Sequence, residues 1–122
     1  MKAVEIAVDA SGKLLRMSFA GTISGADMEP NAAEIEAALP TLQRGFFLLT
    51  DLSGLQSMDL SCVPHIQKTM ELLRDHGVRR VVRIIPEPDK DIGFNIMSLF
   101  HYSRDVKVVT CENQAEAERA LR

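Results

Sequence analysis

The sequence predicts an α/β domain with a mixed, mostly parallel sheet of about five strands and about four helices. Three observations predict it. Apolar residues alternate with period two near the start of the chain, continuous apolar runs follow at 46–50, 78–86 and 106–111, and helical spacing fills the segments between these runs. Strands that alternate with helices favour parallel pairing through right-handed crossovers. The 122 residues, 46% of them apolar, suit one domain over 1–122.

The chain begins with a predicted β-hairpin, followed by a helix. The alternating apolar residues of the hairpin are Val4, Ile6, Val8, Leu15, Met17, Phe19 and Ile23. From Asp27 the spacing changes to three or four residues. The apolar positions of this helix are Met28, Ala32, Ile35, Leu39 and Leu42. Pro40 predicts that the regular helix ends near Leu39.

The remaining elements alternate. The run FFLLT at 46–50 predicts a buried strand that ends at Asp51, and a crossover helix follows with Asp59 or Ser61 as its cap. The apolar stripe of that helix is Val63, Ile66, Met70 and Leu73, and Gly77 is its expected C-terminal stop. Strands at 78–86 and 106–111 flank a helix over about 91–102. Asn113 and Glu116 resemble a capping box that begins the last helix.

Composition excludes several classes of function. Fourteen Lys and Arg against seventeen Asp and Glu give a net charge of −3, so we expect no nucleic acid partner. The beginning of the chain has no continuous apolar signal region, and no stretch is long enough for a membrane span, so we expect a cytoplasmic protein without membrane contact. Cys62 and Cys111 form no CxxC pattern and are expected to be buried thiols. The histidines lack metal-ligand spacing, and we expect neither metal nor cofactor.

The segment TDLSGLQSMDLSCVPHI, residues 50–66, resembles the STAS domain of anti-sigma factor antagonists, the SpoIIAA-like family. Members of that family have an Asp-Leu-Ser-like turn after a hydrophobic strand, which Asp51, Leu52 and Ser53 resemble. An Asp-Ser-Ser-Gly stretch then begins a helix, and here 59–62 take its place, with Leu60 for the first Ser and Cys62 for Gly. The order of predicted elements is similar over almost the whole chain.

The resemblance implies a non-enzymatic regulatory module that binds a protein partner. In that family a serine kinase, itself an anti-sigma factor, phosphorylates the second Ser of the stretch, and the unphosphorylated form binds this kinase. The phosphoacceptor would then be Ser61 and its neighbouring carboxylate Asp59. Sites in parallel sheets lie beyond the carboxyl ends of the strands, which independently indicates residues 51–61.

A helical wheel gives a further test of exposure. Ser61 falls opposite the apolar stripe, with His65, Lys68 and Leu72 beside it, so we expect an exposed outer face whose Leu72 the core does not use. The expected partner-binding residues are Asp51, Ser53, Asp59, Ser61, His65, Lys68 and Leu72. A phosphate on Ser61 would add about −1.5 to −2 charges, which a helix start tolerates and a complementary partner would not. Alternatively, Asp59 and Ser61 act only as cap residues.

Two other classes of function remain open. One is a STAS/SEC14-like module without a phosphoswitch, which binds a small apolar ligand or forms a homodimer through the helix face near Leu72. The other is a cysteine enzyme with Cys62 as nucleophile and His65 as base, although the wheel places Cys62 near the buried stripe. Arg83 interrupts a buried strand, so it needs a sheet edge, an internal carboxylate partner, or an anion or ligand.

Overall fold

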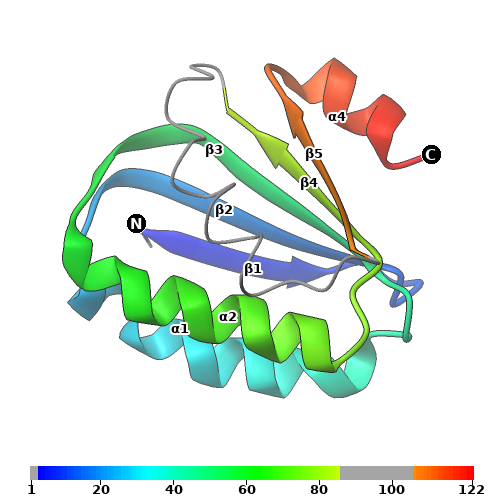
Figure 1. Cartoon of the computed structure of the whole chain (residues 1–122), viewed down its shortest axis with the longest axis horizontal. Coiled ribbons are helices and arrows are strands. Elements are labelled where there is room, and N and C mark those ends of the chain that lie inside the picture. Colours follow the sequence, from blue (N-terminus) through cyan, green and yellow to red (C-terminus); the bar gives the residue numbers. More distant parts are fainter. Residues whose placement is uncertain (1–2, 86–105) are drawn as a thin grey trace.

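The computed structural model describes residues 3–85 and 106–122. A five-stranded sheet with the order β1-β2-β3-β4-β5 lies at its centre (Figure 1). β1 and β2 pair antiparallel as a hairpin, and each later strand is parallel to the one before it. The strands are β1 (Val4–Val8), β2 (Leu14–Ile23), β3 (Phe47–Met58), β4 (Arg80–Ile84) and β5 (Lys107–Cys111). The predicted mixed, mostly parallel sheet with an N-terminal hairpin is confirmed.

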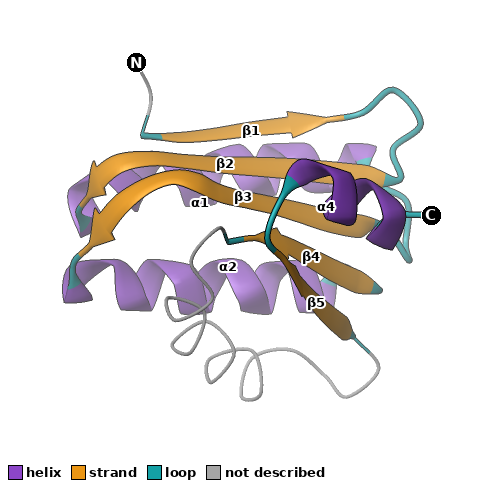
Figure 2. Ribbon diagram, turned by 90° about the horizontal axis from the view of Figure 1, so that it is seen from above, coloured by secondary structure: helices purple, strands orange, loops and turns teal. Residues whose placement is uncertain are grey.

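Helices cover both faces of the sheet unequally. α1 (Gly25–Ala38) and α2 (Val63–Asp75) lie side by side on one face, and the short α4 (Gln114–Ala120) lies on the other (Figure 2). Single 3₁₀ turns, η1 (Leu39–Thr41) and η2 (Leu60–Cys62), follow α1 and precede α2. Three predicted helices are therefore confirmed, and the fourth, over 91–102, lies outside the described residues.

The core has two parts because strand side chains alternate between faces. Leu48 and Val81 belong to the main core beneath α1 and α2, whereas their neighbours Leu49 and Val82 belong to a smaller cluster beneath α4. This explains why the middle strands are continuously apolar in sequence. Burial of apolar area stabilises the fold by about 25 cal/mol per Å², so the larger cluster beneath α1 and α2 contributes most of this stabilisation.

β3 differs from the prediction, which ended this strand at Asp51. It continues to Met58 because β2 is equally extended and pairs with it up to Ile23 and Met58, through two register irregularities. The second half of β3 is mostly exposed, so no hydrophobic alternation marks it in the sequence. The polar residues there occupy a strand rather than a loop.

The helix ends follow local rules. Asp59 caps η2 by accepting a hydrogen bond from the Ser61 N–H, and α2 itself begins at Val63 with Pro64 in its first turn. Gly77 follows α2 with φ +95°, the left-handed stop that the sequence predicts. Asn113 caps α4 through the Glu116 N–H, also as predicted. None of the helices in the described part of the chain is long and apolar enough to cross a membrane.

Candidate functional site

The Ser61 hydroxyl lies at the end of the sheet where β2 and β3 both finish, in the turn η2. Ser61 is exposed, as the sequence predicts. Its oxygen accepts a hydrogen bond of 2.7 Å from the N–H of Gly25, the first residue of α1. The hydroxyl donates in turn to the carboxylate of Asp59, which also accepts from the Ser61 N–H at 2.9 Å. Ser61 is therefore an exposed residue whose hydroxyl is held by two hydrogen bonds.

Gly25 makes this arrangement possible. A Cβ at this position would lie 2.6 Å from the carbonyl oxygen of Ser61 and 3.0 Å from its hydroxyl oxygen, so only glycine permits the close approach. Residues 36 apart in sequence meet here because the parallel pair β2–β3 places Ile23 opposite Met58. Sequence reasoning missed Gly25. The signal was the Ser24-Gly25 pair before a predicted helix, with Asp27 accepting from the Ser24 N–H at 2.8 Å.

An exposed apolar side chain stands directly beside the hydroxyl. Leu60 is 87% exposed and is the one large apolar side chain classed as exposed within residues 3–85 and 106–122. The sequence comparison treated Leu60 only as a replacement for serine. The end of the sheet thus presents an apolar group, a hydroxyl and a carboxylate on three consecutive residues.

The expected partner-binding residues of α2 are only partly exposed. Lys68 is exposed and His65 is half-buried. The expectation that the core leaves Leu72 unused is wrong, because Leu72 is partly buried and packs against the main core. The buried face of α2 includes Thr69, which the predicted apolar stripe did not contain. The buried face is therefore rotated towards Leu72, and Val63 is half-exposed.

Asp51 and Ser53 do not lie beside Ser61. Both belong to β3, where the Asp51 carboxylate accepts from the N–H and the hydroxyl of Ser53. Asp51 pairs in register with Ser18 and Ile84, whereas Met58 at the other end precedes the Ser61 turn. Seven residues at about 3.3 Å each separate Asp51 from Met58, on the order of 20 Å. The predicted surface is therefore divided into two regions.

Cys62 is not poised for catalysis. It is fully buried, as predicted, and its thiol donates to the carbonyl oxygen of Ile23 at 3.4 Å. Burial, and to a lesser extent the charge of Asp59, raises the pKa of this thiol. A neutral buried thiol is a poor nucleophile. We expect a thiol reagent to modify Cys62 only after unfolding. Rapid labelling of the native protein would instead support the cysteine-enzyme interpretation.

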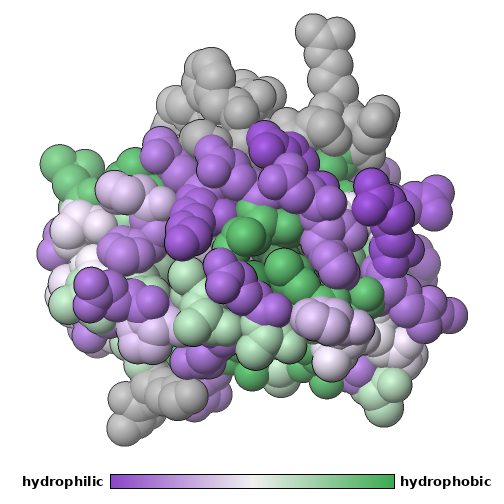
Figure 3. All heavy atoms as spheres, turned by 90° about the horizontal axis from the view of Figure 1, so that it is seen from below, coloured by the Kyte–Doolittle hydropathy of each residue, from purple (hydrophilic) through white to green (hydrophobic). Residues whose placement is uncertain are grey.

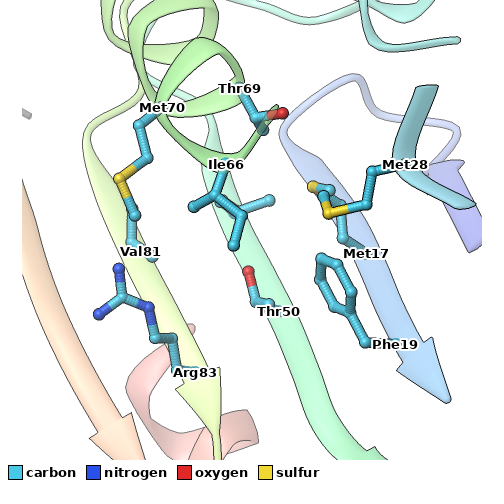
Figure 4. Close-up of a pocket in the computed structure, with 10 residues that line it drawn as sticks. Met17, Phe19, Met28, Thr50, Ile66, Thr69, Met70, Val81 and Arg83 are labelled. Carbon is cyan, nitrogen blue, oxygen red and sulfur yellow. The ribbon is translucent and has the colours of Figure 1, made fainter. Parts of the chain in front are cut away.

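A small pocket lies beneath α2, over the first half of β3 and the adjacent β4 (Figure 4). It leaves a cavity of about 40 Å³. Most of its lining is apolar, but three polar side chains also line it, Thr50, Thr69 and Arg83. Arg83 is only 2% exposed, and β4 lies between β3 and β5, so the edge-strand interpretation of Arg83 is wrong.

The described residues contain no group of three or more His, Cys, Asp or Glu side chains arranged to hold a metal ion. Both cysteines are free thiols.

Comparison with family models gives no match, and comparison with curated proteins gives none either. Solved structures do match, and at 16–18% identity the match concerns the α/β fold. An uncharacterised DUF3478-family protein from Shewanella loihica PV-4 with a SpoIIAA-like fold has a TM-score of 0.74 at 17% identity, over 98% of this chain and 93% of that one. The chain therefore has the SpoIIAA-like fold that the resemblance of residues 50–66 implies.

Two SpoIIAA structures are also similar. The anti-sigma factor antagonist SpoIIAA in its unphosphorylated form has a TM-score of 0.67 at 16% identity, over 97% of this chain and 96% of that one. The Bacillus cell fate determinant SpoIIAA in its phosphorylated form has a TM-score of 0.63 at 18% identity, over 98% of this chain and all of that one. At these identities the likeness concerns the fold.

Proposed function

We propose that this protein is a regulatory, non-enzymatic protein-binding module of the anti-sigma factor antagonist type, switched by phosphorylation of Ser61. The observation that carries the proposal is the exposed Ser61 hydroxyl, oriented by Gly25 and Asp59 at the end of the sheet. Similar folds have been solved for SpoIIAA in both unphosphorylated and phosphorylated forms, which supports a fold that tolerates a phosphate. The expected partner is an anti-sigma factor serine kinase, and the expected location is the cytoplasm.

The local chemistry supports a switch. Asp59 accepts the hydrogen bond from the Ser61 hydroxyl, so a carboxylate stands where the proton leaves when a kinase transfers a phosphoryl group from ATP to this oxygen. The phosphoester has no hydroxyl hydrogen, so that hydrogen bond is lost and a charge of about −1.5 to −2 faces Asp59. The Gly25 N–H remains available to a phosphate oxygen at the N-terminus of α1.

The docking surface in this proposal centres on the same end of the molecule. Leu60 supplies an exposed apolar contact, and His65 and Lys68 follow on α2. A partner that packs on Leu60 and accepts a neutral hydroxyl would be repelled by the added charge and would leave polar groups unpaired. Asp51 and Ser53 form a separate polar region, which a partner reaches only by extending along β3.

The experiment compares binding of an anti-sigma factor serine kinase encoded near this gene to wild type, Ser61→Asp and Gln114→Glu. Gln114 is exposed at the start of α4, on the other face of the sheet, and serves as a charge-matched control. We expect Ser61→Asp to weaken binding at least about tenfold and Gln114→Glu to leave it unchanged. The kinase should phosphorylate wild type and not Ser61→Ala. Unchanged binding by a folded Ser61→Asp protein contradicts the proposal.

A second candidate function needs no phosphorylation: binding of a small apolar ligand. The pocket beneath α2 favours it, because a mostly apolar lining with a few convergent polar groups is typical of ligand sites. Native mass spectrometry of the purified protein should then detect a bound small molecule.

Self-association is the other form of this alternative. Figure 3 shows apolar side chains gathered among hydrophilic ones on the face that carries α1 and α2. Light scattering distinguishes a dimer from a monomer. Leu72→Lys would not test such an interface cleanly, because Leu72 also packs against the core.

A further inference from the structure

A row of polar side chains crosses the helix-covered face of the sheet. Thr50 of β3 pairs in register with Arg83 of β4, which places the two backbones about 4.8 Å apart. Leu48 and Val81, two residues earlier on each strand, belong to the main core beneath the helices. Thr50 and Arg83 therefore face the same side. They are 8% and 2% exposed, which is unusual burial for a hydroxyl and a guanidinium.

Apolar side chains surround this polar pair. Met17 and Phe19 come from β2, Met28 from α1, and Ile66 and Met70 from α2 (Figure 4). Together with Thr50, Thr69 and Arg83 they line the cavity of about 40 Å³, which we call the methionine pocket. Its volume corresponds to about three water molecules by this measure.

The two threonines indicate that the pocket is built for a polar group. Thr69, like Thr50, is 8% exposed, and neither side-chain hydroxyl makes a hydrogen bond with any residue that the structure describes. Neither oxygen is a fully buried atom left without a partner, so both remain reachable from the pocket they line, where a polar group of a ligand can pair with them. Arg83 already interacts within the protein, but a guanidinium has five N–H donors and accommodates a second acceptor.

We propose that the methionine pocket binds a short-chain monocarboxylate, with its carboxylate at Arg83 and Thr50 and its alkyl chain among the methionines. The planar guanidinium matches a carboxylate by two parallel hydrogen bonds, and the hydroxyl of Thr50 donates a third. A fully polar anion would leave the apolar walls unmatched, and a volume of about 40 Å³ favours a short alkyl chain over a long one. This proposal rests on the second candidate function, binding of a small ligand, and specifies the chemical class of that ligand. It does not depend on Ser61.

Methionine methyl NMR on the full chain tests this directly. The probes are butyrate and its uncharged counterpart butan-1-ol. Met17, Met28 and Met70 line the pocket, whereas Met58 does not and lies at the other end of β3, so it serves as an internal control. We expect butyrate to shift the three pocket methyl signals at millimolar concentration and to leave Met58 unchanged, because so few non-hydrogen atoms support only weak binding.

Two variants assign the binding to the polar row. Thr50→Val removes the hydroxyl with little change of shape, and we expect butyrate to bind about five- to tenfold more weakly. Arg83→Met should abolish the preference for butyrate over butan-1-ol, and if that variant does not fold, Thr50→Val still decides the matter. Ser61→Ala should bind butyrate as wild type does.

The possible outcomes distinguish the carboxylate inference from the broader proposal that the pocket binds a small apolar ligand. Selective butyrate shifts that Thr50→Val weakens support the inference. Equal shifts by butan-1-ol and butyrate overturn the carboxylate inference and leave the pocket as an apolar ligand site. No shift of the pocket methyl signals by either probe overturns both the inference and the second candidate function.

Discussion

Gly25→Ala is the sharpest test of how Ser61 is held. The added methyl group would lie 2.6 Å from the Ser61 carbonyl oxygen and 3.0 Å from both the Cβ and the hydroxyl oxygen. The first contact is with backbone, which cannot move away as the end of a flexible side chain can. The turn η2 and the start of α1 must therefore separate.

The expected magnitude follows from three terms. Separation lengthens or breaks the 2.7 Å hydrogen bond between Gly25 and Ser61, worth about 1 kcal/mol. Inserting a methyl group into a packed contact costs about 1 to 3 kcal/mol. The higher helix propensity of alanine and the stiffer unfolded chain return up to about 1 kcal/mol. The variant should be less stable than wild type by about 1 to 3 kcal/mol.

Urea denaturation followed by circular dichroism measures this loss, with an unchanged m-value expected. Gly54→Ala is the matched control, because its Cβ would lie no closer than 3.3 Å to the Phe19 carbonyl oxygen, and it should change stability by less than about 1 kcal/mol. The Ser61→Ala protein, which loses only the hydroxyl, should fall between the control and Gly25→Ala. A Gly25→Ala protein as stable as wild type would refute the close contact between α1 and η2.

Three further predictions concern stability, measured by denaturant unfolding. Asp59→Ala removes the cap of η2 and should cost about 1 kcal/mol; no loss would show that the cap is dispensable. Leu72→Lys should cost about 1 to 2 kcal/mol, whereas Leu60→Lys should stay within about 0.5 kcal/mol; equal effects would contradict the burial difference. The hydrogen bond from Ser11 lowers the pKa of Asp9 below its ordinary 3.8. The ionised Asp9 carboxylate therefore stabilises the fold fully above pH 3.8, and this stabilisation is lost as the pH falls through the lower pKa of the folded state. Asp9→Asn should therefore be less stable than wild type at neutral pH and equal to it in strong acid, and a difference that persists in acid would contradict this.

The middle of the fold was predictable because burial leaves a pattern in the sequence. Leu48 and Leu49 face different helix layers, and so do Val81 and Val82, so both strands had to be continuously apolar. The second half of β3 had no such mark. Backbone hydrogen bonds to β2 hold residues 52–58 in a strand whatever their side chains, and turn-like polar residues there suggested a loop.

The exposure of a site residue was predictable where it depends on one helix alone. Contacts between two elements were not predictable. A single-helix wheel correctly placed Cys62 inside and Ser61 outside. The same wheel misplaced Leu72, because the burial of Thr69 depends on how α2 lies on the sheet. Gly25 and Ser61 meet only through the β2–β3 register, which no local pattern encodes.

The two regions proposed as functional lie at different positions along β3, so their effects can be separated. Thr50 and Met58 are eight residues apart in one strand, on the order of 25 Å. α1 is the element common to both, because Gly25 at its first residue contacts Ser61 and Met28, less than one turn later, lines the methionine pocket. Sites separated by more than about 7 to 10 Å without shared partners usually add within about 0.5 kcal/mol. Thr50→Val and Ser61→Asp should therefore have additive effects on stability, and a coupling above about 0.5 kcal/mol in the double variant would mean that the two regions interact through α1.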